Sequence, residues 1–274
     1  MKTFKIRLFR KQSGKNVVIK KYSSGKENKR ANNHGKGGME FIFTEKIMNE
    51  YIKTDSVVAE IGCATGHYAF RFAGKCREYK GYDLSPANIK IFRRKIKDSG
   101  LSNISADVSD ATNLCNIPDS TFDVVMVLGP MYHLDFSNRL LAFKETKRIC
   151  KDGGIVAFAY INKAGASIAA IVNEAFNGKY PTKECNRAVL QKGISDKNDS
   201  VFFFSTPEEM INCATECGFG IIKSCGLNFV LSPDKIKAMP DEQYEAWLEL
   251  TQYMSESPSC TGMSEHALLI CRKV

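Results

Sequence analysis

The sequence predicts an α/β fold with a doubly wound, mostly parallel sheet. Strand-like and helix-like segments alternate between residues 56 and 161, and a loop of small residues at 62–66 follows the first strand. The segment at 122–128, FDVVMVL, is almost wholly apolar, as a central parallel strand should be. Alternating strands and helices of this length form right-handed crossovers, which place the strands parallel in one sheet.

The elements follow from apolar periodicity and from capping residues. Ser85 and Thr206 are predicted helix N-caps, each with proline at the first helical position. The run Asp152-Gly153-Gly154 predicts a turn that separates a helix from the fifth strand. We expect strands at 56–61, 79–82, 103–108, 122–128, 155–161, 220–231 and 267–271, helices at 40–52, 67–73, 86–99, 137–150, 168–176 and 206–217, and a helical insertion at 233–258 around Trp247.

The N-terminal segment differs in charge from the rest of the chain. Residues 1–30 hold 11 of the 39 Lys and Arg residues but one of the 30 acids, so they carry a charge of +10, and the rest of the chain, at −1, brings the net charge to +9. FKIRLF and NVVIKKY predict two short strands around a turn at 13–16, followed by a loop at 23–38. Such an arm can bind nucleic acid, but a solubilising terminus is the favoured interpretation, because no basic and aromatic patch continues into the body.

These boundaries divide the chain into a basic extension, residues 1–38, and one domain, residues 39–274, with insertions at 162–205 and 232–262 that we expect to cap a substrate. No apolar run is long enough for a membrane span, and the basic N-terminus is unlike a secretory signal, which predicts a cytoplasmic protein. The sequence leaves a monomer and a homodimer equally open.

Cysteine and histidine are distributed without any metal-ligand spacing. The ten cysteines include no Cys-x-x-Cys pair, and the four histidines are widely scattered, so we expect no metal site. Most of these cysteines are predicted to be small buried side chains in a reducing compartment.

The loop after the first strand carries the strongest chemical signal. Gly62, Ala64 and Gly66 lack bulk, so the backbone can turn sharply and a ligand can approach it closely. A dinucleotide fingerprint, G-x-G-x-x-G, would need glycine at positions 64 and 67, which are alanine and histidine. The observed pattern is instead E-x-G-x-A-x-G, beginning at Glu60.

Further motifs follow in a fixed order. Asp83 ends the second strand, Asp110-Ala111 follows the third, Leu128–Leu134 (LGPMYHL) follows the fourth, and Lys151–Gly154 precedes the fifth. Together with the glycine loop, this order resembles the class I S-adenosylmethionine-dependent methyltransferases over roughly residues 39–161. Ala64 departs mildly from the family's middle glycine.

The resemblance implies a seven-stranded Rossmann-like sheet with an antiparallel C-terminal strand and helical lid insertions. It also implies S-adenosyl-L-methionine as cofactor, with S-adenosyl-L-homocysteine as product. The implied donor site consists of Glu60, Gly62, Cys63, Ala64, Gly66, Tyr68, Asp83, Leu84, Asp110, Ala111, Leu128 and Gly129.

Two acids have specific roles in that family. Asp83 would accept both ribose hydroxyls, and Asp110 would accept from the adenine amino group, with Asp107 as a competitor for the latter role. Each acid also has a purely structural interpretation, as a helix cap or a turn residue.

Methyl transfer needs mainly alignment of the reacting atoms, and a base only when the acceptor carries a proton that must leave. His133, beside Tyr132, is the candidate base, because an imidazole exchanges protons near neutral pH. We expect Phe41, Tyr132, His133 and Tyr160 to contact the substrate. Packing of the loop is the alternative role for Tyr132 and His133.

A small-molecule acceptor is the favoured substrate class. Signatures of nucleic-acid methyltransferases are missing: the fourth strand is followed by Gly-Pro-Met-Tyr rather than Asn/Asp-Pro-Pro-Tyr, and no Pro-Cys pair occurs. Two alternatives stay open. One is an RNA methyltransferase guided by residues 1–30, and the other is an S-adenosylmethionine-binding protein without catalytic activity.

Overall fold

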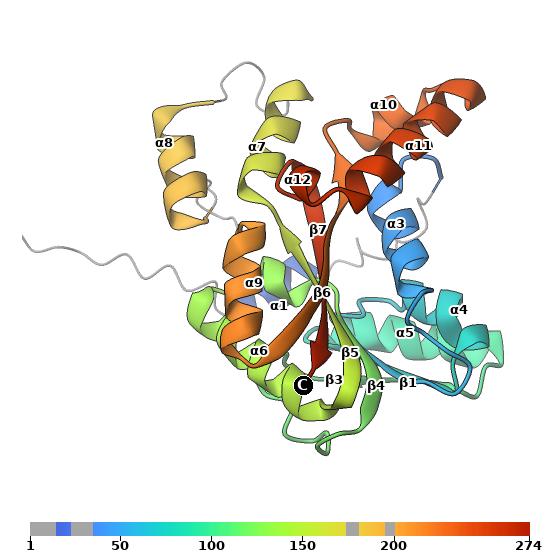
Figure 1. Cartoon of the computed structure of the whole chain (residues 1–274). Coiled ribbons are helices and arrows are strands. Elements are labelled where there is room, and N and C mark those ends of the chain that lie inside the picture. The colour runs from blue at the N-terminus through green and yellow to red at the C-terminus, as the bar shows by residue number, and fades with distance from the viewer. Residues whose placement is uncertain (1–14, 23–34, 174–180, 195–200) are drawn as a thin grey trace, which may run out of the picture.

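The computed structural model describes residues 15–22, 35–173, 181–194 and 201–274 (Figure 1). The strands are β1 (Val57–Ile61), β2 (Glu78–Asp83), β3 (Ile104–Val108), β4 (Phe122–Val127), β5 (Cys150–Ile161), β6 (Phe219–Phe229) and β7 (Ser264–Lys273). The helices are α1 (Lys15–Tyr22), α3 (Met39–Met48), α4 (His67–Phe72), α5 (Pro86–Ser99), α6 (Phe136–Ile149), α7 (Lys163–Val172), α8 (Lys183–Asn186), α9 (Pro207–Glu216), α10 (Pro233–Lys237), α11 (Asp241–Glu256) and α12 (Pro258–Thr261). Short helical turns lie at Ala73–Lys75, Pro130–Tyr132 and Arg187–Gln191.

The strands form one seven-stranded sheet in the order β3-β2-β1-β4-β5-β7-β6. Strands β1 to β5 are parallel, whereas β7 runs antiparallel to both β5 and β6. The predicted fold class, including the antiparallel C-terminal strand, is therefore confirmed. Since the order reverses between β1 and β4, the carboxyl ends of these strands border the crevice where ligands bind in open α/β sheets.

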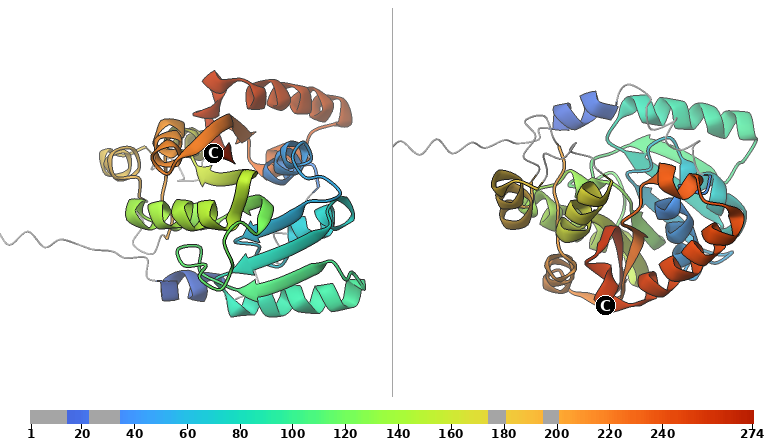
Figure 2. Two further views of the ribbon diagram at one scale, coloured as in Figure 1. Left: turned by 60° about the horizontal axis from the view of Figure 1, so that its bottom comes forward. Right: turned by 90° about the horizontal axis from the view of Figure 1, so that it is seen from above.

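Helices cover both faces of the sheet (Figures 1 and 2). On one face, α3, α4 and α5 bury aromatic side chains, including Phe43, Phe72 and Phe92, in a hydrophobic core. Apolar side chains of α11 pack against the same core. On the other face, α6 and α9 pack Phe143 and Met210 against the inner strands. Burial on both faces explains why β1 and β4 are nearly continuous apolar runs.

The predicted N-caps are confirmed. The Ser85 hydroxyl accepts from the Asn88 backbone N–H at 3.4 Å at the start of α5. At α9, Thr206 and Glu209 form a reciprocal capping box, which satisfies two backbone donors that a helix start would leave unpaired. These caps fix where α5 leaves the carboxyl end of β2 and where α9 begins.

The prediction for NVVIKKY was wrong, because residues 15–22 form the helix α1 rather than a strand. Val17, Val18 and Ile19 are β-branched and favour strands locally. Val18, Ile19 and Tyr22, however, recur at helical spacing and face a pocket, so tertiary packing outweighs local propensity. The companion strand expected at FKIRLF lies outside the described residues.

The turn predicted at Asp152-Gly153-Gly154 lies inside β5, which begins at Cys150. Gly153 has φ +73°, and the register of β5 against β4 shifts between Phe122 and Val124. The glycine pair therefore makes an irregularity within the strand instead of a separate turn. Helix α7 likewise starts at Lys163, five residues before the predicted start.

The helical insertion expected at 233–258 consists of α10, α11 and part of α12. Trp247 packs against the core cluster that contains α3. Within the described ranges, no helix is long and apolar enough to cross a membrane.

We predict that Gly66→Ala destabilises the fold by about 1–3 kcal/mol, because an overpacked site must move its neighbours. Gly66 has φ +84°, and an added Cβ would lie 2.1 Å from the Phe92 ring of α5. Gly74→Ala is the matched control, since nothing lies within 4 Å of its Cβ position. Urea unfolding of both variants measures the difference, and equal stability would contradict this packing.

Candidate functional site

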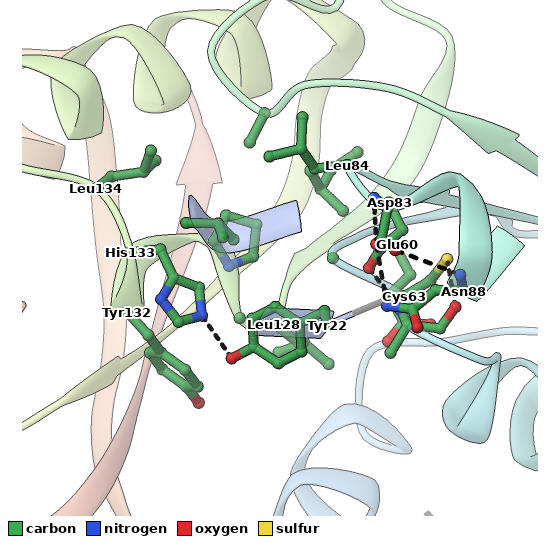
Figure 3. Close-up of a pocket in the computed structure, with 18 of the residues that line it drawn as sticks. Tyr22, Glu60, Cys63, Asp83, Leu84, Asn88, Leu128, Tyr132, His133 and Leu134 are labelled. Atoms are coloured by element: carbon green, nitrogen blue, oxygen red, sulfur yellow. Dashed lines mark hydrogen bonds between the residues drawn. The ribbon is translucent and has the colours of Figure 1, made fainter. Parts of the chain in front are cut away.

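A cavity of about 610 Å³ opens at the carboxyl ends of β1, β2 and β4, within the size range of small-molecule sites (Figure 3). It combines most of the residues that the sequence suggested. The pocket is lined by Phe41, Glu60, Gly62, Cys63, Ala64, Tyr68, Asp83, Leu84, Asp110, Ala111, Leu128, Gly129, Tyr132 and His133.

Two predicted site residues do not line this pocket. Gly66 faces Phe92 beneath the loop, where it allows close packing of α5. Tyr160 is 1% exposed in the core on the α6 and α9 face of the sheet. Of the two insertions expected to cap the substrate, 232–262, with Trp247, does not line the pocket. The other, 162–205, contacts His133 through Val201 and Phe202.

The β1 loop has an unusual backbone. Gly62 and Ala64 have φ +87° and +46°, a region that only glycine adopts without strain. An added Cβ at Gly62 would lie 2.5 Å from the Pro130 side chain, so the β1 and β4 loops approach each other too closely for any larger residue. The Ala64 strain is offset by its backbone N–H, which donates to Asp83 Oδ2 at 2.9 Å.

Asp83 holds the two neighbouring loops together. Besides the bond from Ala64, its Oδ1 accepts from the Ser85 backbone N–H at 2.8 Å and from Asn88 Nδ2 at 3.2 Å. Burial raises the pKa of Asp83, although these three bonds oppose the shift. A carboxylate has about four acceptor positions, so one remains on Oδ2 for a ligand.

Asn88 lines the pocket but was not among the residues predicted from the sequence. Its side-chain oxygen is buried and has no hydrogen-bond partner among the described residues. A buried acceptor without a partner costs free energy, which a ligand hydroxyl would recover. Its position in the first turn after the Ser85 cap was the available signal.

Glu60 lies beneath the loop and is almost fully buried. Burial raises its pKa to about 7, and the bond that Tyr79 donates to Oε2 at 2.7 Å only partly opposes that shift. Glu60 therefore titrates near neutral pH at the floor of the pocket.

Asp110 lies at the far end of the pocket and forms an ion pair with Lys15 of α1. Its Oδ1 accepts from the Thr112 N–H and hydroxyl at 2.9 and 2.8 Å. Burial by itself would raise the pKa of Asp110, but the bonds from Lys15 and Thr112 outweigh it and lower the pKa. Its competitor Asp107 lies outside the lining and pairs with Arg93.

His133 occupies the opposite end of the pocket. Its Nδ1 lies 3.1 Å from the Val201 carbonyl oxygen, and its Nε2 lies 2.8 Å from the Tyr22 hydroxyl (Figure 3). A carbonyl only accepts, so these partners assign the proton to Nδ1 and make Nε2 the acceptor of the Tyr22 hydroxyl. Burial, helped by the charge of Lys21, lowers the pKa of His133 to about 4, although the bond to the Val201 carbonyl opposes the shift.

Arg139 holds the loop that carries His133 in place, a role that was not predicted from the sequence. Its buried guanidinium donates from Nε to the Met131 carbonyl at 3.3 Å and also bonds the Ser205 hydroxyl. Above the loop, the Tyr132 hydroxyl donates to Glu40 Oε1 at 3.1 Å. These bonds hold Tyr132 and His133 against the pocket, although nothing in the local sequence around Arg139 indicates this role.

The described residues include no group of three or more His, Cys, Asp or Glu side chains that could hold a metal ion.

Part of the sequence is similar to known methyltransferases. Residues 58–154 match the methyltransferase domain family. The chain is 31% identical over 116 residues to a demethylmenaquinone methyltransferase of Bacillus subtilis strain 168, a match that covers 41% of this chain and only about half (48%) of that relative. It is 25% identical over 173 residues to a ubiquinone biosynthesis O-methyltransferase of Thiobacillus denitrificans, covering 63% of this chain and 68% of that protein.

Solved structures share the fold. An S-adenosylmethionine-dependent methyltransferase from Methanosarcina mazei superposes with a TM-score of 0.58 at 16% identity, covering 83% of this chain and 97% of that one. The [4+2]-cyclase SpnF superposes with a TM-score of 0.54 at 18% identity, covering 84% and 79%. Since a cyclase shares this fold, the fold alone does not establish the reaction.

The sequence match, the fold and the pocket agree on the class. Residues 58–154 form a methyltransferase domain, and the chain has the fold of S-adenosylmethionine-dependent methyltransferases.

We predict that the His133 imidazole titrates near pH 4 in the full-length protein, because it is buried beside Lys21. Deleting residues 1–22 removes both that lysine and the cover of α1, so the pKa should rise towards its unperturbed value of about 6.5. NMR titration of the histidine ring protons measures both values. A midpoint near 6.5 in the full-length protein would show that α1 does not cover this ring.

Proposed function

We propose that the protein transfers a methyl group from S-adenosylmethionine to a small-molecule acceptor. One observation carries this proposal: a single pocket joins the β1 loop, Asp83 and Asp110 to the loop that ends in Tyr132 and His133. The proposed donor-binding groups and the candidate base thus share one pocket, as a transfer between two bound molecules requires.

The pocket residues fit the donor. The β1 loop lets a ligand approach its backbone, and Asp83 Oδ2 and the unpaired Asn88 oxygen are two acceptors for a vicinal hydroxyl pair such as that of a ribose. This differs from bidentate binding by Asp83 alone, because its Oδ1 already has two donors. When bound, the donor supplies an electrophilic methyl group on a positively charged sulfur.

The acceptor side is small and largely aromatic. Phe41, Tyr132 and His133 line it, and α1 lies along its mouth. Two of the relatives are named demethylmenaquinone methyltransferase and ubiquinone biosynthesis O-methyltransferase, which supports a ring compound as the acceptor class.

An RNA acceptor is less well supported. In the described part of the basic arm, Lys15 pairs with Asp110 and Lys21 lies 3.8 Å from the centre of the Phe202 ring. Lys15 thus contacts the pocket itself, and Lys21 contacts a ring that packs against His133. Salt-dependent RNA binding that disappears when residues 1–30 are deleted would favour the RNA alternative.

We predict that Asp83→Asn weakens binding of S-adenosylmethionine by about 10-fold to 100-fold, since a hydrogen bond to a charged group is worth about 1.5–3 kcal/mol. Asp107→Asn is the matched control, because Asp107 is a neighbouring acid outside the pocket. Isothermal titration calorimetry measures both, and thermal unfolding confirms that each variant is folded.

The same experiment separates the alternatives. Folded wild-type protein that does not bind S-adenosylmethionine contradicts the proposal. Binding without methyl transfer to any of a broad set of small acceptors or RNA would identify a non-catalytic binding protein.

A further inference from the structure

The helix α1 lies along the whole length of the pocket. Its first residue, Lys15, pairs with Asp110 at one end, and its last, Tyr22, contacts His133 at the other. Val18 and Ile19 line the pocket between them, whereas Val17 is 48% exposed on the other side of the helix. One face of α1 is thus a wall of the pocket, although it belongs to the basic N-terminal segment.

Tyr22 forms a hydrogen bond with Nε2 of His133, which is the ring nitrogen that could act as a base. The Nδ1 proton is committed to the Val201 carbonyl at 3.1 Å, so the basic lone pair is on Nε2. The Tyr22 hydroxyl donates to that lone pair at 2.8 Å, and the two rings meet edge to face with centroids 5.3 Å apart. An acceptor in this pocket therefore meets Tyr22 before it meets Nε2.

This arrangement leaves two roles for Tyr22. It is either a cover that must move away before His133 can act, or a relay that passes the proton on. A phenol oxygen can accept two hydrogen bonds while it donates one, so Tyr22 can accept from a ligand hydroxyl without losing His133. The relay requires the Tyr22–His133 hydrogen bond that is present in the structure, whereas the cover would have to break it.

We propose that Tyr22 is a catalytic residue, which accepts the hydrogen of the acceptor's hydroxyl group and passes its own proton to His133. This inference rests on the proposed methyltransferase function. It names the acceptor as a neutral hydroxyl compound, such as a phenol, that binds between Tyr22 and Tyr132.

The proton balance is complete. As the acceptor oxygen gains the methyl group, its O–H bond breaks and its proton goes to Tyr22 Oη, while the Tyr22 proton goes to His133 Nε2. The positive charge that arrives with the sulfonium ends on the imidazolium, and the donor leaves as a neutral thioether. His133 later releases the proton to water.

The environment of His133 suits this role. Burial and Lys21 keep the ring neutral at physiological pH, so Nε2 is ready to accept. A weak base is sufficient, because a hydroxyl oxygen that is being methylated becomes a much stronger acid than an imidazolium. The same burial makes the imidazolium release its proton readily.

The test replaces Tyr22 by phenylalanine, which keeps the ring and removes the hydroxyl. Val17→Ala is the matched control on the outer face of α1. With S-adenosylhomocysteine bound, NMR of ¹⁵N-labelled histidine follows Nε2 of His133 as phenol is added at millimolar concentration. Anisole, the same ring without the hydroxyl hydrogen, is the control ligand. We expect phenol alone to shift the Nε2 signal, in wild type and Val17→Ala but not in Tyr22→Phe.

Turnover gives the second measurement, with radiolabelled S-adenosylmethionine and a set of simple phenols and catechols. General acid–base catalysis contributes about 10²-fold to 10⁴-fold, so kcat of Tyr22→Phe should fall by that factor while donor affinity stays the same. A variant as active as wild type, or more active, would show that Tyr22 is only a cover and overturn the relay. Absence of any phenol effect in wild-type protein that binds the donor would overturn the relay and leave the proposed function intact.

Discussion

The pocket depends on the hydrogen bonds that the Asp83 carboxylate accepts from two neighbouring loops. Parallel strands bring the carboxyl ends of β1 and β2 side by side, and Asp83 bonds the backbone of both following loops, at Ala64 and Ser85. The β1 loop needs this support, because Ala64 has positive φ and Gly62 packs against Pro130 of the β4 loop. One buried acid thus fixes the β1 loop and, through Asn88, the start of α5.

The acceptor end is organised differently, by contacts between distant segments. The loop carrying Tyr132 and His133 is bonded by Arg139 from below and by Glu40 of α3 from above. Its outer side is closed by the segment at 201–204, whose Phe203 N–H donates to the Tyr132 carbonyl at 2.8 Å. Relatives with the same strand order can therefore differ here without loss of the donor site, which agrees with a cyclase and methyltransferases sharing this fold.

Sequence reasoning succeeded where local backbone chemistry decides the outcome. The sheet follows from apolar periodicity, and α5 and α9 begin at the capping residues Ser85 and Thr206. It failed at α1, where β-branched residues favour a strand but a helical face packs on the pocket. It also gave no reason to place Tyr160 outside the pocket. Alternate residues of a strand face opposite sides of the sheet, but residues 155–161 are all apolar, so the pattern does not show which side faces the pocket.

The sequence by itself determined the glycine loop and the strand-end acids of the proposed donor end, since these residues act through backbone positions that the fold class already places together. Only the tertiary structure decided the proposed acceptor end. Tyr22 and His133 are 111 residues apart, and the tautomer and low pKa of His133 result from Val201, Lys21 and burial together. The partnerless oxygen of Asn88 is likewise visible only in the folded chain. Such long-range contacts leave no periodic pattern in a single sequence, because they depend on packing between elements rather than on neighbouring residues.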